Sequence, residues 1–306
     1  MRSNTYHTGS GGSDSQMHGR RAAFSLIEIM ITSALLSFIV LGLLAMFNQT
    51  QRAFRSGMTQ TDVLESGRAA LDMLSRELEQ ITPSQEPYTT NFFAEPTVLF
   101  SRPMVQDLAG SSLARTNMVQ KFYFLTRFNT EYDGIGYQVI PEYPNAGVGS
   151  LCRFSEGLPT RFGALYLSRD FYNAPLTNLN RIVDGVVHLR VRAFDTAGRL
   201  IAEELSRYQD PKTLRGGVPE NTIVSTNIFV GGDRIQCDQA AIYMMSNAVP
   251  AFVELEMGVL EPQILRRWRS ISAPEAQLEF LARYAPNVHI FRQRIPVRNV
   301  DFSAYQ

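Results

Sequence analysis

The chain has 306 residues, of which 44% are apolar, and its 29 basic residues balance its 29 acidic residues. That apolar fraction is sufficient for a packed core, so disorder of the whole chain is excluded. A net charge of zero also excludes a general electrostatic attraction to nucleic acid or to an anionic membrane surface, and function must come from local features.

Only two cysteines occur in the chain, Cys152 and Cys237. They are too few for a disulfide framework and are not spaced as metal ligands. Two interpretations stay open: one disulfide bridge in an oxidising compartment, or two unpaired thiols.

The N-terminal region changes character abruptly. Residues 1–18 are rich in Gly, Ser, Thr and Asn without periodicity, which is typical of a flexible segment. The basic cluster Gly19-Arg20-Arg21 then borders an apolar run, residues 24–47, in which Glu28 is the only charge. About 20 apolar residues cross a bilayer core as a helix, and preceding basic residues favour keeping that end in the cytoplasm. The sequence therefore predicts a single-pass protein of the cytoplasmic membrane, with the rest of the chain in the periplasm or outside.

On hydropathy alone, an ordinary signal anchor or an uncleaved secretory signal peptide explains the apolar run as well as any more specific interpretation does. A conventional signal peptide needs a small-residue cleavage site after its apolar region, and Ala45 is the only candidate there. A carboxylate such as Glu28 costs about 2.5 kcal/mol or more in lipid unless it finds a partner. Glu28 therefore either meets a positive group or extends toward the lipid headgroups.

The run from Arg21 to Met30, RAAFSLIEIM, resembles the cleavage and methylation motif of type IV pilins and type II secretion pseudopilins. The resemblance implies that a prepilin peptidase cuts between Ala23 and Phe24, and that the new amine of Phe24 is methylated. The family prefers glycine before the cut, where this chain has Ala23. Glu28, the fifth mature residue, is then expected to neutralise the Phe24 amine of a neighbouring subunit, which offsets both desolvation costs.

Residues 48–82 are more polar but keep an apolar stripe at helical spacing. The expected stripe consists of Phe54, Met58, Leu64, Leu71, Leu74, Leu78 and Ile81. Pro83 closes the run, so one helix is expected from Phe24 to about Ile81, with Gly42 and Gly57 as points where it can bend. Residues 24–47 suit a membrane, and residues 48–82 suit packing against a sheet.

Residues 83–306 consist of short alternating segments between turns, which predict a β-rich head. Strands are expected at residues 98–100, 121–128, 137–140, 151–154, 187–193, 251–259 and 288–297, with a helix at 274–284 and a long loop within 205–247. In the clearest strand, Val187, Leu189, Val191 and Ala193 are expected on one face. The fold class is therefore α+β, a pilin-like long helix packed on an antiparallel sheet.

The order of the head segments resembles the larger minor subunits of the family, J-type minor pseudopilins and W-type minor pilins. It implies a structural subunit, a minor pilin or pseudopilin, assembled through its N-terminal helix. The implied partners are other pilins or pseudopilins, prepilin peptidase, the inner membrane and the inner-membrane assembly platform. The sequence does not separate a type II secretion pseudopilus from a type IV pilus.

Motifs for chemistry are missing from the sequence. The four histidines form no ligand pair, and neither a Gly-rich phosphate loop nor a Gly-x-Ser-x-Gly elbow occurs. Glu254 and Glu256 are interpreted as a solvated strand face, while a calcium site from scattered oxygens stays open. Arg266-Arg267-Trp268-Arg269 is interpreted as a surface turn with a buried Trp268 rather than as a site for single-stranded DNA.

The chain is therefore expected to be no enzyme and to hold no cofactor, and its sequence gives no strong evidence for a nucleic-acid partner. The alternative function is a membrane-anchored enzyme or binding protein that uses residues 24–47 only as a tether. That alternative predicts no processing and full function after Glu28→Gln.

Overall fold

The computed structural model describes residues 25–97, 99–100, 105–107, 114–144, 146–176, 179–201, 222–225, 227–231 and 241–305. The chain divides into two compact units, Met1–Arg55 and Ser56–Gln306. Helix α1, Leu26–Leu78, contributes to both units, and the second unit holds the strands. An apolar helix together with an antiparallel sheet makes the fold α+β, as the sequence predicts.

The described elements of the second unit after α1 are mainly strands, with a few short helices between them. In chain order they are β1 Thr90–Pro96, β2 Val105–Asp107, β3 Ala114–Thr116, β4 Gln120–Phe128, β5 Glu131–Pro141, β6 Gly149–Pro159, η1 Thr160–Phe162, α2 Leu167–Asn173, β7 Asn180–Phe194, β8 Thr222–Ser225, β9 Ile228–Gly231, β10 Ala241–Met245, β11 Phe252–Leu260, α4 Pro262–Arg269, α5 Pro274–Arg283, η5 Ala285–Asn287, β12 Val288–Pro296 and η6 Phe302–Tyr305.

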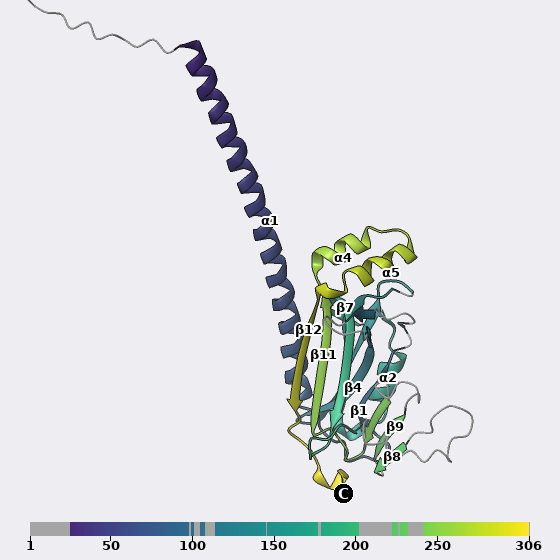
Figure 1. Cartoon of the computed structure of the whole chain (residues 1–306). Helices are drawn as coiled ribbons and strands as arrows, with labels where there is room; N and C mark the ends of the chain where they lie inside the picture. The colour runs from purple at the N-terminus through teal and green to yellow at the C-terminus, as the bar shows by residue number, and fades with distance from the viewer. Residues whose placement is uncertain are drawn as a thin grey trace, which may run out of the picture. The chain divides into compact units, whose positions relative to one another are not determined.

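Ten of the described strands form one sheet, in the order β12-β11-β7-β6-β5-β4-β1-β10-β9-β8 (Figure 1). Neighbouring strands pair antiparallel throughout, and β2 pairs with β3 in a separate ribbon. The sheet also curls, because Val119, just before β4, forms a bridge with Leu189 of β7. The predicted strands near 121–128, 137–140, 151–154 and 187–193 are confirmed within longer elements, and those at 251–259 and 288–297 are confirmed to within one residue at each end.

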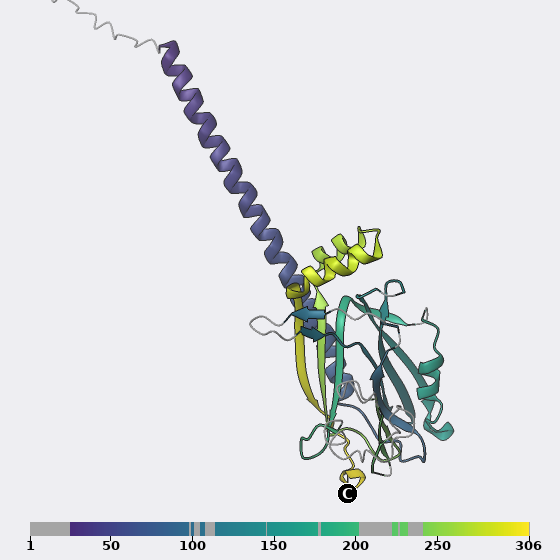
Figure 2. The same ribbon diagram turned by 45° about the vertical axis from the view of Figure 1, so that its right-hand side comes forward.

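Both faces of the sheet are covered. The head-bound part of α1 packs on one face, where Leu74 and Leu78 join Phe122 and Phe124 of β4 in the main core. Helix α2 covers the other face, where Leu167 packs with residues of β1, β4 and β6. Figure 2 shows α1 and α2 on opposite sides of the sheet. Strand β4 is therefore apolar on both faces, which its sequence QKFYFLTRF reflects.

Two strand predictions are wrong. The segment 98–100 is no strand at its described residues, Leu99 and Phe100, and the first strand is β1 instead. Residues 205–247 are no continuous loop, because β8, β9 and β10 extend the sheet beyond β1. These strands are four or five residues long, which is too short for a clear alternation to show in the sequence.

The predicted face of Val187 is also wrong. The register of β7 on β11 shifts between Gly258 and Val259, which leaves Val187 as an extra residue. This β-bulge turns Val187 into a second cluster with Leu260 and Trp268, whereas Leu189 stays in the main core.

The helical stripe holds only in part. Phe54, Met58 and Leu64 are exposed, while Leu71, Leu74 and Leu78 are buried as predicted. In the two turns before Leu71, the buried positions are Val63, Gly67 and Ala70 instead. The helix also ends at Leu78 rather than near Ile81, since Ile81 pairs with Thr126 in an isolated bridge.

Candidate functional site: an apolar helix and its first turn

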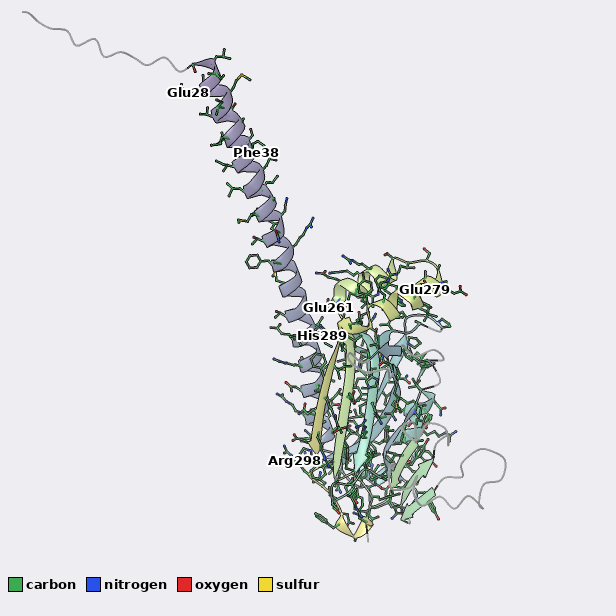
Figure 3. The ribbon with its side chains drawn as sticks, in the orientation of Figure 1. Glu28, Phe38, Glu261, Glu279, His289 and Arg298 are labelled. Carbon is green, nitrogen blue, oxygen red and sulfur yellow. The ribbon has the colours of Figure 1, made fainter. Side chains whose placement is uncertain are left out.

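The first half of α1 is apolar on all sides. Residues Leu26–Phe54 have a mean hydropathy of 2.5 in their most apolar window, none of which is buried. Leu26 and Phe38 are 78% and 76% exposed, and Figure 3 shows Phe38 projecting away from the helix. By length and composition this segment can cross a membrane.

The helix begins with a capping sequence. The Ser25 hydroxyl accepts a hydrogen bond from the Glu28 backbone N–H at 3.3 Å, and the Ser25 carbonyl accepts from Glu28 and Ile29 at 3.0 and 3.3 Å. Ser25-Leu26-Ile27-Glu28 has the S-x-x-E form of a capping box, with the acid at the third helical position. A negative charge there also complements the positive end of the helix dipole.

Glu28 therefore has a local role that the sequence interpretation missed, although the S-x-x-E spacing signals it. Its carboxylate lies in the first turn, as labelled in Figure 3. Ala23 and Phe24 lie outside the described residues, so cleavage and methylation stay predictions.

Hydroxyl groups inside the apolar segment are satisfied by the helix itself. Thr32, Ser33, Ser37 and Thr50 each donate to a carbonyl three or four residues earlier, at 2.8–3.0 Å. This matters because an unpaired hydroxyl is costly in an apolar medium. The segment is thus compatible with either lipid or packed apolar helices around it.

The head-bound part of α1 is held by polar contacts as well as by its leucines. Tyr137 of β5 donates to Glu77 at 2.5 Å, and Arg153 of β6 pairs with Glu77 at 3.0 Å. Tyr137 is buried and the two charged groups are partly buried, which strengthens the charged hydrogen bonds. Arg298, beyond β12, pairs with Glu79 and donates its backbone N–H to the Glu79 carbonyl at 3.2 Å.

Cys152 is a buried thiol on β6. Its Sγ donates to the Ser150 carbonyl at 3.6 Å, and burial raises its pKa. A pocket of about 520 Å³ lies beside it, lined by Glu142, Arg181, Asp184 and Arg269 among others. These four side chains pair with one another, so the lining carries no net charge. Cys237 lies outside the described residues, and the possible disulfide stays a prediction.

Glu254 and Glu256 form no solvated face, contrary to the sequence interpretation. They are 7% and 6% exposed on β11. Glu254 is covered by Arg192 and Arg292 of the neighbouring strands, at 3.0 and 2.9 Å. Among the residues that the structure describes, no group of three or more His, Cys, Asp or Glu side chains is suited to a metal ion.

The basic segment 266–269 belongs to helix α4 and not to a turn. Trp268 is buried as predicted and stacks on Tyr143, with ring centroids 5.5 Å apart. Arg269 forms a bidentate pair with Glu142. The tryptophan is a core residue and presents no stacking surface for a base.

Histidines occupy separate places in the head. His188 is buried and accepts the Met118 N–H on Nδ1 at 3.0 Å, which leaves its Nε2 to carry the proton and face Glu256 at 3.7 Å. The Nε2 of His289 lies 3.3 Å from Oε1 of Glu261. Figure 3 labels both residues near the start of β12. The two rings belong to structural contacts of the sheet.

No protein-family model matches the chain, and comparison with curated proteins and with solved structures finds no similar chain.

Proposed function

We propose that the chain is a prepilin-like structural subunit, a minor pilin or pseudopilin of a type IV pilus or a type II secretion pseudopilus. It inserts into the inner membrane through the apolar half of α1, is processed before Phe24, and joins a filament through laterally packed N-terminal helices. Such packing is heterologous and does not close, which suits an open helical assembly.

One observation carries the proposal: the exposed, apolar first half of α1 has a single acid, in its first turn, shortly after a basic cluster. A positive amine at Phe24 of an adjacent subunit gives Glu28 a partner once the helices leave water. The β-rich head, tied to α1 through Glu77, is consistent with this role. Its size favours a tip or priming position, because a bulky head crowds a repeating shaft.

The first test is mass spectrometry of the mature N-terminus in cells that contain a prepilin peptidase. We expect a chain that begins at N-methylated Phe24. Recovery of the intact leader, or of another start, contradicts the proposal. The matched variant Ala23→Gly, which restores the residue that the family prefers, is expected to be processed at least as completely.

The second test separates assembly from capping at Glu28. Glutamine at this position keeps the S-x-x-E/Q capping geometry but lacks the charge. We expect Glu28→Gln and Glu28→Ala both to lose crosslinking between neighbouring N-terminal helices. If Glu28→Gln assembles normally and only Glu28→Ala fails, the acid serves the helix cap alone.

A membrane-tethered binding protein is the second candidate, and the capping box favours it. An acid in the first turn of a helix is favourable without any neighbour, because it complements the positive end of the helix dipole. This function predicts an unprocessed chain whose Glu28→Gln variant is fully active.

Genes beside this one help to separate the two filament types within the proposed function. A secretion ATPase and a secretin without a retraction ATPase favour the pseudopilus.

A further inference from the structure

The sheet ends at a long, regular edge strand. Strand β12 pairs with β11 over nine residues without a register shift. In Figure 3 it runs between the labelled His289 and Arg298. The only proline in the strand, Pro296, is its last residue, so no proline or bulge interrupts the middle of the edge.

The outer side of this strand presents unpaired backbone groups. Val297 donates its N–H to the Ala251 carbonyl at 3.0 Å, so odd-numbered residues of β12 face β11. Ile290, Arg292 and Arg294 therefore direct their N–H groups away from the sheet. Within the described part of the chain, no backbone acceptor bonds to these three groups. The outward N–H groups on either side of these three are bonded: Val288 donates to the Ala285 carbonyl, and Arg298, past the end of the strand, donates to the Glu79 carbonyl.

The face beside this edge carries an excess of arginine. Across β7, β11 and β12, in register, Glu254 lies between Arg192 and Arg294, and Glu256 lies between Arg190 and Arg292. Four arginines thus surround two glutamates. Arg294 stacks on the rings of Phe194 and Phe252, 4.1 and 4.8 Å from their centroids. The positive excess lies at the edge strand, where Arg292 and Arg294 are exposed.

This charge selects among strands that could pair with the edge. A second copy of β12 in antiparallel pairing places arginines beside arginines, which is destabilising. A partner strand is stabilised if its acids lie beside Arg292 and Arg294 and its apolar residues lie on the other face, where Ile295 joins the core that α1 covers. Strand β11, which fills this role on the inner side, shows the pattern: Glu254 and Glu256 alternate with Val253, Leu255 and Met257.

We propose that the outer edge of β12 binds an extended segment of a partner protein by strand addition, and that acidic residues alternate with apolar ones in this segment. Main-chain hydrogen bonds to Ile290, Arg292 and Arg294 supply affinity, and the arginines supply specificity. The proposal does not depend on filament assembly, because it concerns the head alone.

The test uses the full chain in detergent micelles and a labelled peptide with the sequence of residues 252–260, FVELEMGVL. Two matched peptides replace both glutamates by arginine, or methylate alternate backbone amides so that strand pairing is blocked. We expect each change to weaken binding at least tenfold, and bound peptide to slow hydrogen exchange at the amides of residues 290, 292 and 294. Equal affinity for the three peptides, or protection at another strand, overturns the proposal.

Two variants of the protein test the same contacts from the other side. Ile290→Pro removes one outward N–H without removing a ladder hydrogen bond, and Arg294→Glu reverses a charge at the edge. Both are expected to lose at least tenfold in peptide affinity while circular dichroism and the melting temperature show a folded head. Retained affinity in both folded variants overturns the proposal, as does dimerisation of the wild type through β12 in the absence of peptide.

Discussion

The two halves of α1 are both helical but differ in how their apolar residues are distributed and in whether those residues are buried. Between Leu26 and Phe54 apolar residues occur on every side of the helix and none of the most apolar window is buried, whereas from Val63 to Leu78 only one side is apolar and the sheet covers it. The second half also carries charged contacts such as Glu77 with Arg153. An apolar surface of the first kind is typical of a segment that meets lipid or other apolar helices.

The largest expected effect comes from removing a buried leucine of the second half. Leu74 is 1% exposed, so Leu74→Ala is expected to lower the free energy of unfolding of the head by about 2–5 kcal/mol. The matched change Leu41→Ala, at a residue 62% exposed, is expected to change it by less than about 0.5 kcal/mol. Chemical denaturation followed by tryptophan fluorescence measures both, since Trp268 lies in the head. Equal losses for the two variants contradict the division of α1 into two halves.

A second contrast uses glycines. A Cβ on Gly67 lies 2.3 Å from the Phe291 ring, whereas a Cβ on Gly42 meets nothing within 4 Å. Gly67→Ala is therefore expected to destabilise the head by about 1–3 kcal/mol through overpacking. Adding Phe291→Leu to that variant should restore part of the loss, and Gly42→Ala alone should cost nothing. Thermal unfolding of wild type and these three variants measures the effects, and an unchanged melting temperature for Gly67→Ala contradicts the overpacking.

A smaller loss is expected at the polar contact. Glu77→Gln leaves Arg153 without its charged partner in a partly buried site, which costs about 1–3 kcal/mol. Glu65, exposed on the same helix, provides the control, and Glu65→Gln is expected to stay within about 0.5 kcal/mol of wild type. A double-mutant cycle with Arg153→Met measures the coupling, and a coupling near zero removes Glu77 as a link to the sheet.

The smallest effect concerns pH. Burial raises the pKa of Glu95, but hydrogen bonds from Lys121 and Tyr243 outweigh it, and the net shift is downward from 4.5. A lowered pKa in the folded state adds stability above that ordinary value, and the added stability is lost as the pH falls through the folded value. Wild type should therefore lose stability below about pH 4.5 more steeply than Glu95→Gln. Parallel pH profiles of the melting temperature contradict this assignment.

The sequence predicts features that depend on local periodicity and misses those that depend on partners distant in the chain. Alternation located β11, and helical spacing located Leu71, Leu74 and Leu78. Strand β1 was missed because Phe92 and Phe93 are both buried, on opposite faces, and so show no alternation. The contact of Glu77 with Arg153 joins residues 76 positions apart, which no spacing rule identifies.

In the candidate site, too, features set by local sequence could be predicted and those set by distant partners could not. The apolar helix follows from hydropathy, and its membrane role, like the processing at Ala23 and Phe24, stays a prediction. Burial of Glu254 could not be predicted, because the arginines that cover it come from two other strands. The cap at Ser25 could have been predicted from the S-x-x-E spacing alone.

The bulge at Val187 gives one strand access to two separate cores. Gly185 precedes it with φ at +76°, a conformation that suits glycine, and the added residue lets Val187 and Leu189 point to opposite sides. Shortening β7 by this one residue would merge the two sides into a single alternation and take away one of the side chains that pack α4 and α5 on the sheet. The stacking of Trp268 on Tyr143 and the pair of Arg269 with Glu142 also hold these helices to the head, so the bulge strengthens their attachment with one further apolar contact.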